Sequence, residues 1–255
     1  MIQFFIDVWE IITNYGELLL QGVGNTLLIA LVGTVFGLII GLLIGILRTT
    51  AYSKKTPLRI LHKIANGICA CYIEIFRGTP MMVQAMIIFW GYAFASGGNT
   101  LPLVASGIFI VSINTGAYMA EIVRGGIISI DKGQFEGAQS IGMSHFQTMT
   151  HIVIPQVMRN ILPSISNEFV INIKDTSVLN VIGVMEIYYF AEVIAKLNLE
   201  IFQTYFVICV MYFILTFGVT KFLRFCEKKL EGGKSYTIFG SQSAPEAEIK
   251  VKGGN

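Results

Sequence analysis

The segment Leu162 to Gly183, LPSISNEFVINIKDTSVLNVIG, places polar side chains on one face of an otherwise apolar helix. Ser164, Glu168, Asn172 and Asp175 recur at spacings of four, four and three residues, with Lys174 beside them. If this helix crosses a membrane, each charge costs roughly 2.5 to 3.5 kcal/mol unless it faces protein, water or an opposite charge. The face should therefore line a cavity or interface that binds a polar solute. The alternative is an internal ion pair of Lys174 with Glu168 or Asp175.

Other polar groups interrupt a second apolar segment and its flanks. Asn114 should lie near the middle of the segment Leu101 to Ile122, with Tyr118 one turn further on. The charged residues near predicted helix ends are Glu74, Arg77, Glu121 and Arg124. Glu121 and Arg124, three residues apart, share a face and can pair. We expect the other two at the membrane boundary, where charge is tolerated, although an ion pair inside the membrane is an alternative.

The composition is typical of an integral membrane protein. Of 255 residues, 54% are hydrophobic and 13% are charged, and the mean hydropathy is +0.67. Segments of about 20 apolar residues suffice to cross a bilayer as helices. Five such segments are predicted, at about 27–47, 80–96, 101–122, 162–183 and 204–222. We therefore predict an all-α membrane domain over 1–233 and a flexible cytoplasmic tail over 234–255.

Two further sequence features bear on how the helices pack. Gly33, Gly37, Gly41 and Gly45 form a stripe of small residues on the first span, which favours close helix packing within the subunit or against a partner. The segment 57–76 alternates apolar and polar faces at helical spacing. This pattern predicts an interfacial helix lying flat on the cytoplasmic surface.

Basic residues indicate the orientation of the chain. They gather after the first, third and fifth predicted spans, whereas the opposite side carries Asp7, Glu10 and Glu17 and few cations. By the positive-inside rule the N-terminus lies outside and the C-terminus in the cytoplasm. The net charge of +2 follows from this arrangement and implies no nucleic-acid partner.

A polar insert, EGAQSIGMSHFQTMTHIVIP, occupies residues 136–155 within a cytoplasmic loop predicted over 131–160. It favours a short helix from about Gln134, a turn or cap at Gly142, and a second stretch ending at Pro155. An ordered cytoplasmic loop with small exposed residues such as Gly137 and Ala138 offers a surface on which another protein can dock.

The insert resembles the cytoplasmic signature of the membrane subunits of ATP-binding cassette (ABC) importers. That signature is E-A-A, three residues, G, nine residues, I-x-L-P, and Glu136 to Pro155 reproduces its spacing with Gly137 and Ile154 as departures. The chain is further similar to the polar amino-acid permeases of histidine, glutamine, arginine and cystine type. The segments that carry this similarity are FRGTPMMVQ, AYMAEIVRGGI, KGQFEGAQSIGMS and NEFVINIKDTSVLNVIG.

The resemblance implies a type I importer (MetI-like) permease fold with five transmembrane helices in the bacterial cytoplasmic membrane. It also implies several partners: two ABC ATPase subunits, a second permease subunit that is a copy or a sibling, an extracytoplasmic binding protein and a polar amino acid. ATP and Mg belong to the ATPase, and this chain binds no cofactor or metal. The ATPase-docking residues would be Glu136, Gly137, Ala138, Ser140, Ile141 and Gly142.

In this scheme the substrate pathway contains Asn114, Tyr118, Ser164, Glu168 and Asn172, and Glu168 can face a substrate ammonium. The charges Glu74, Arg77, Glu121, Arg124, Lys174 and Asp175 are structural or gating residues. Closure of the ATPase pair would push the coupling helix and produce alternating access.

The sequence disfavours other functions. The segment EGGKSY ends like a phosphate loop, but Lys228 replaces the leading glycine, so the chain should hydrolyse no ATP. Cys69 and Cys71 alone are a weak metal signal, and no HExxH or G-x-S-x-G motif supports an enzyme. A secondary amino-acid transporter working without an ATPase is the main alternative, but the inverted repeats typical of that class are not evident.

Overall fold

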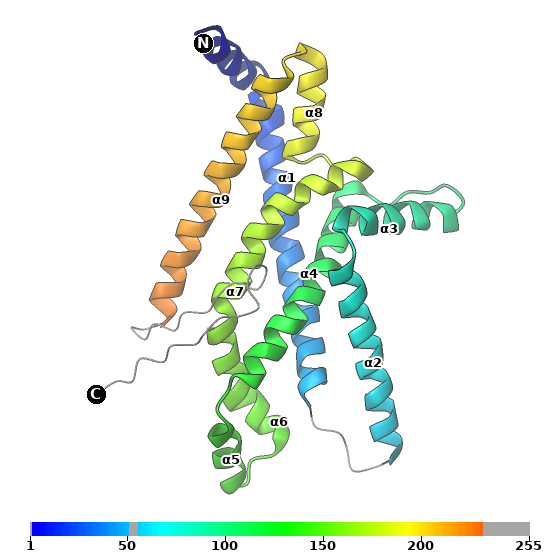
Figure 1. Ribbon diagram of the computed structural model, residues 1–255, viewed down its shortest axis with the longest axis vertical. Coiled ribbons are helices and arrows are strands. Elements are labelled where there is room, and N and C mark those ends of the chain that lie inside the picture. The colour runs from blue at the N-terminus through cyan, green and yellow to red at the C-terminus, as the bar shows by residue number, and fades with distance from the viewer. Residues whose placement is uncertain (1, 51–55, 232–255) are drawn as a thin grey trace.

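The computed structural model describes residues 2–50 and 56–231, and within these ranges all regular structure is helical (Figure 1). The long helices are α1 (Ile2–Thr49), α2 (Thr56–Gly78), α4 (Leu103–Ile128), α7 (Ile154–Asp175) and α9 (Ile201–Glu231). The shorter elements are α3 (Met81–Ala95), α5 (Lys132–Ser140), α6 (His145–Thr148), the π-helical turn η1 (Met149–Val153), the 3-10 helix η2 (Thr176–Ile182) and α8 (Ile187–Asn198). The predicted tail, 234–255, lies outside the described residues.

Three described helices are long and apolar enough to cross a membrane: α1, α4 and α9. A fourth candidate is a bent pair, His145–Ile182 with Ile187–Asn198, which turns by 55° at its break. By length and hydropathy alone, the described helices therefore give fewer crossings than the five predicted from the sequence.

The first span is much longer than the predicted 27–47. The helix α1 contains 48 residues, about 72 Å at 1.5 Å per residue. A bilayer with its headgroups measures only about 40–45 Å, so the helix is longer than one crossing requires. Its N-terminal end lies beside the start of α9, where Phe4 contacts Phe202 and Phe206.

The length of the helix at 80–96 does not support the crossing predicted there. This segment forms α3, whose 15 residues span about 22 Å, less than the ~30 Å hydrocarbon core. Figure 1 shows α3 lying across the long axis of the molecule, near the end that carries α8. It packs against η2, and its buried Ala85 and Phe89 belong to a core cluster with Leu179. Its apolar sequence thus reflects packing at one end of the helical bundle.

The segment 57–76, predicted to lie flat on the surface, forms α2, which contacts two neighbouring helices. The helix α2 packs against α4, meeting it near the α2–α3 junction and diverging from it toward the N-terminal end of α2 in Figure 1. At one end His62 Nε2 is 3.0 Å from the carbonyl oxygen of Leu47, near the end of α1. At the other end the Tyr72 hydroxyl donates to the carbonyl of Ile113, near the middle of α4. Tyr72 belongs to the apolar stripe of the predicted interfacial helix, and its hydroxyl bonds to a neighbouring helix.

The glycine stripe of α1 is the seam between α1 and α4. A Cβ atom on Gly37 would lie 2.8 Å from the Cβ of Thr115, and one on Gly33 or Gly45 would meet Val111 or Val123. Such distances are shorter than real side-chain contacts allow. The missing side chains therefore let the backbones of α1 and α4 approach closely within one subunit.

Candidate functional site

A cavity of about 150 Å³ lies between the end of α2, helix α4 and helix α7. Its lining residues come from three separated segments of the chain: Thr79, Pro80, Met81, Asn114, Tyr118, Glu168, Ile171, Asn172 and Asp175. Four of the five residues predicted for a substrate pathway are among them. The structure therefore brings these four together, although it does not test what they bind.

Glu168 is the most buried charged group of this cavity. Its residue is 3% exposed, and its Oε1 atom has no hydrogen-bond partner among the described residues. Burying a carboxylate without partners is costly. Because Asp175 lines the same cavity, the site holds two carboxyl groups and suits a ligand that carries a positive charge.

Asn172 is held in place by neighbouring helices. Its Nδ2 donates to Thr34 Oγ1 on α1 at 2.8 Å, and its Oδ1 accepts from Thr115 Oγ1 on α4 at 3.1 Å. All three side chains are buried. The amide therefore connects α1, α4 and α7 at the cavity wall.

Asn114 is fixed from the opposite side by a residue that sequence reasoning missed. Its Nδ2 donates to Gln84 Oε1 at 2.9 Å. The Gln84 amide in turn donates to the backbone oxygens of Phe76 and Thr79, at 3.0 and 2.9 Å. Gln84 thereby ties the α2–α3 junction to α4. Its position in the apolar sequence PMMVQAMIIF is a signal that could have identified it.

The predicted charges Glu74 and Arg77 do not pair with each other, since the ion pairs of the described residues join Glu121 to Arg48, Glu121 to Arg124, and Glu192 to Lys196. Instead the guanidinium of Arg77 lies over the Tyr118 ring, 5.5 Å from its centroid. Such a contact contributes about 0.5–1 kcal/mol at an exposed site. Arg77 therefore adjoins the cavity through one of its lining residues.

The expected ion pair of Glu121 and Arg124 is present, and a second cation also pairs with Glu121. Arg124 donates to Glu121 Oε2 through Nε at 2.9 Å and a terminal nitrogen at 2.7 Å. Arg48, at the end of α1, pairs with Oε1 of the same carboxylate. This carboxylate is thus shared by two cations and joins α1 to α4 beyond the glycine seam.

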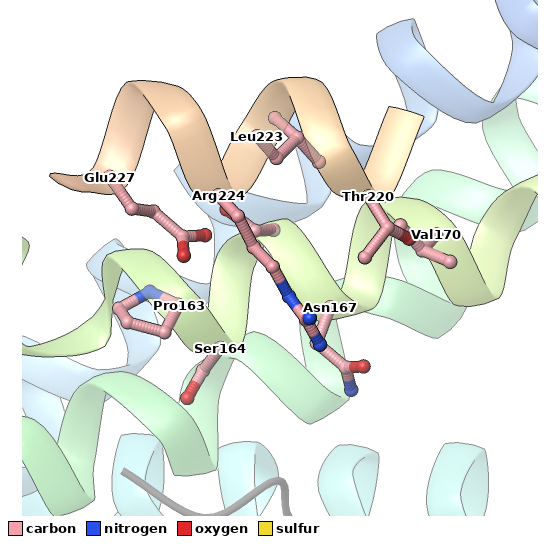
Figure 2. A pocket seen from close by; sticks show the side chains of 9 residues that line it. Pro163, Ser164, Asn167, Val170, Thr220, Leu223, Arg224 and Glu227 are labelled. Atoms are coloured by element: carbon pink, nitrogen blue, oxygen red, sulfur yellow. The ribbon is translucent and has the colours of Figure 1, made fainter. Parts of the chain in front are cut away.

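Ser164 lies away from the other predicted pathway residues. It lines a separate cavity between α7 and α9 with Asn167 and Arg224 (Figure 2). Lys174 is exposed and lines another part of the α7–α9 cleft. The alternative considered for this face, an internal ion pair of Lys174 with Glu168 or Asp175, is absent among the described residues, because none of their three ion pairs includes Lys174.

The second candidate region is the loop between α4 and α7, at the far end of the molecule from α8 (Figure 1). The helix α5 begins at an Asp131 cap, whose side chain accepts from Gly133 N at 2.6 Å. Gly142 follows the helix with φ of +80°, a conformation that disfavours other residues. A capping box of Ser144 and Gln147 then starts α6. Local hydrogen bonds therefore order the loop.

One of the predicted docking residues of this loop is not exposed. Ala138 is 2% exposed, so it faces inward and cannot contribute to a docking surface. The other predicted docking residues are exposed: Glu136, Gly137, Ser140, Ile141 and Gly142. Ile141 and Phe146 are 76% and 75% exposed and add apolar surface to the loop. Phe146 was not singled out from the sequence, although its place inside the polar insert is a usable signal.

The loop is packed against the ends of α4 and α7. Val123 and Ile127 of α4 form one buried cluster with Met149, Val153 and other apolar residues of η1 and α7, and Phe135 of α5 packs on it. Gln156 of α7 also donates to Gln134 of α5 at 3.2 Å. The loop is therefore in contact with both long helices that line the cavity.

The chain is similar to several characterised proteins. It is 34% identical over 223 residues to the glutamine transport system permease protein GlnP of Escherichia coli (strain K12), covering 88% of this chain and 97% of the relative. It is 33% identical over 225 residues to the L-cystine transport system permease protein TcyB of Bacillus subtilis (strain 168), covering 88% and 91%.

A crystal structure of an amino acid ABC transporter with histidines superimposes with a TM-score of 0.72 and 32% identity, covering 86% of this chain and 96% of that chain. The family model described as "Binding-protein-dependent transport system inner membrane component" matches residues 37–232. These similarities confirm the resemblance to amino-acid ABC permeases predicted from the sequence. The helices, the cavity and the ordered loop are therefore those of a member of the binding-protein-dependent transport system inner membrane component family, to which this chain belongs.

Proposed function

We propose that this chain is the permease subunit of an ATP-driven importer that moves a polar amino acid across the bacterial cytoplasmic membrane. The observation that carries the substrate assignment is the buried Glu168 side chain, whose Oε1 has no hydrogen-bond partner among the described residues, in a cavity of about 150 Å³. At roughly 30 Å³ per water molecule, this space suits one small solute. Relatives named for glutamine and cystine transport support the same class of substrate.

The cavity offers partners for both ends of a zwitterion. Glu168 and Asp175 attract an ammonium group, while the hydroxyl of Tyr118 can donate a hydrogen bond to a carboxylate. This arrangement favours neutral polar or cationic amino acids over acidic ones. The binding protein contributes its own selection before the substrate reaches the membrane.

We propose that the chain crosses the membrane five times and that the second crossing is α2 instead of the segment 80–96. The helix α2 is amphipathic, contains 23 residues and packs against α4, so it can serve as the second crossing in place of α3. The crossings would be α1, α2, α4, α7 with η2, and α9, with the N-terminus outside and α5 in the cytoplasm. The distribution of basic residues supports this orientation.

Labelling of single cysteines tests this orientation. In intact cells, after replacement of the native cysteines, a membrane-impermeant thiol reagent should modify Gly98→Cys in the α3–α4 turn. It should modify Gln139→Cys on α5 only after the membrane is opened. Labelling of both residues from the same side would contradict the arrangement.

Transport is proposed to be coupled to separate ATPase subunits through residues 136–155. Each ATPase, carrying ATP and Mg, would seat α5 in a groove, and closure of the ATPase pair would move α4 and α7 together. The packing of α5 and η1 on these helices supports this route. A second permease subunit and an extracytoplasmic binding protein complete the proposed complex.

Uptake by the reconstituted complex tests the substrate site. Proteoliposomes containing permease, ATPase and binding protein should accumulate a labelled polar amino acid when ATP is present. Glu168→Gln should lower uptake at least tenfold without loss of complex assembly, because the neutral amide attracts an ammonium far less than a carboxylate does. Glu10→Gln, at an exposed carboxylate outside the cavity, is the matched control.

Two results would argue against the proposal. Normal uptake by Glu168→Gln would remove this cavity from the pathway. Gradient-driven uptake by the permease alone, without any ATPase, would favour a secondary transporter.

A further inference from the structure

The cleft between α7 and α9 carries an excess of positive charge that the transport function does not use. One part of the cleft has a volume of about 310 Å³ and is lined by Val170, Lys174, Phe213, Thr216, Phe217, Thr220, Lys221 and Arg224. Three of these residues are cations, and none is a carboxylate. Among the described residues, the three ion pairs involve other cations.

A second part of the cleft continues from the first, because both share Val170, Thr220 and Arg224. It measures about 290 Å³ and adds the hydrogen-bonding side chains of Ser164 and Asn167 and one carboxylate, Glu227, so the whole cleft has three cations and one anion. Figure 2 shows Arg224 extending from α9 toward Asn167, with Glu227 on the same side. The cleft therefore has a polar, basic end and an apolar wall.

The depth of the cleft matches a membrane boundary. The apolar helix α9 begins at Ile201, and about 20 residues cross the hydrocarbon core. Lys221 and Arg224 thus lie at headgroup level. Phe213 and Phe217, about one to three turns before them, lie at the depth of acyl chains. The ammonium of Lys221 already lies over the Phe217 ring, 5.3 Å from its centroid.

We propose that this cleft binds an anionic phospholipid. Its phosphate would accept hydrogen bonds from Arg224 and Lys221, with Ser164 and Asn167 as neutral partners, and one acyl chain would follow Phe217 and Phe213. A planar guanidinium matches phosphate geometry, and basic pockets between transmembrane helices suit anionic headgroups. An amphiphile satisfies the basic end and the apolar wall together, which a soluble anion does not.

Lipid retention by the assembled importer tests this proposal. The complex is extracted from vesicles of phosphatidylcholine and phosphatidylglycerol, and the lipids that remain bound are identified by native mass spectrometry. We expect selective retention of phosphatidylglycerol. The variants Arg224→Gln and Lys221→Gln should each weaken it about fivefold, the effect expected for one cation near a headgroup.

Lys229→Gln is the matched control. It removes the same charge from the same helix, at a position that lines neither part of the cleft and lies on the stripe of exposed Phe222 and Phe225. Retention in this variant should equal that of the unchanged protein. Because all three substitutions are at exposed residues of α9, folding should persist and is checked by assembly of the complex.

Three outcomes would overturn the proposal. Equal retention in all variants would mean that the lipid contacts are unspecific. Displacement of phosphatidylglycerol by inorganic phosphate at equal concentration would point to a soluble anion. Efficient disulfide cross-linking of Thr220→Cys to the second permease subunit would show that protein covers the cleft. Transport does not enter these readouts, so the result is independent of the substrate site.

Discussion

Asn172 on α7 donates a hydrogen bond of 2.8 Å to the hydroxyl of Thr34 on α1, 138 residues away in the chain. Both side chains are buried, and Asn172 lines the candidate substrate cavity whereas Thr34 does not. The bond therefore joins the cavity wall to a helix that has no direct contact with a ligand there. Through this bond, α1 helps to hold the Asn172 side chain in place at the cavity wall.

Thr34→Val tests the importance of this support. Valine has nearly the same shape but no acceptor, so the Asn172 amide loses one of its buried partners. We expect the assembled complex to lose about 1–3 kcal/mol of stability, seen as a lower Tm, together with slower uptake. Thr13→Val, at an exposed hydroxyl of the same helix, should change neither. Unaltered uptake and Tm in Thr34→Val would show that the bond contributes nothing.

Much of the site could be predicted because membrane burial makes polar residues informative. Glu168, Asn172 and Asp175 were placed together from their spacing, since carboxylates on an apolar helix need a cavity or partner. Their partners could not be predicted. Thr34 bonds Asn172 across 138 residues of sequence, and Gln84 bonds Asn114 across 30. The spacing of residues within one helix does not indicate which distant residues will contact it.

The fold was predicted correctly in type and less well in detail. An amphipathic pattern shows that a helix has two different faces, but it does not show whether water, lipid or another helix covers each face. For this reason α2 was placed on the surface although it packs against α4. The orientation of Ala138 was missed for the same reason, because a short helix with few apolar residues gives a weak periodic signal.

Gly37→Ala should weaken the seam between α1 and α4. The added Cβ would meet Thr115 Cβ at 2.8 Å, so the helices must separate, at a cost of about 1–3 kcal/mol. A Cβ on Gly24 of the same helix meets nothing within 4 Å, and Gly24→Ala should be neutral or slightly stabilising. Thermal unfolding of the purified complex measures both. Equal Tm values for the two variants would mean that the seam tolerates separation.

Glu121→Gln should be more damaging than Arg124→Gln. The carboxylate accepts from Arg124 and also pairs with Arg48, so its loss leaves two neighbouring cations without their partner, whereas loss of Arg124 leaves one pair intact. Because these side chains are 20–37% exposed, we expect a difference of only about 1 kcal/mol. A double-mutant cycle on the complex, read by Tm, measures it. A larger loss in Arg124→Gln would contradict the shared carboxylate.

Glu136→Lys and Gly142→Arg should abolish transport while the protein remains folded. Glu136 is an exposed residue of α5, and Gly142 has a φ of +80° that arginine adopts poorly, so each change alters the surface offered to the ATPase. The measurement is ATPase stimulation by liganded binding protein in the reconstituted complex, which should be lost.

The matched control for this experiment is Glu10→Lys, an equal charge reversal at an exposed position in the N-terminal part of α1, at the opposite end of the molecule. Stimulation should persist in this variant. Normal stimulation in both loop variants would remove α5 from the coupling route.

The glycine seam restricts how the sequence of this protein can change during evolution. Because four glycines of α1 must each meet a particular residue of α4, inserting or deleting a single residue in either helix would misalign every later contact at once. Substitutions can accumulate on the lipid-facing sides of these helices, but their register cannot drift. Length variation in such a protein should therefore be confined to segments outside the seam, and two homologues with different loops should still align here without gaps.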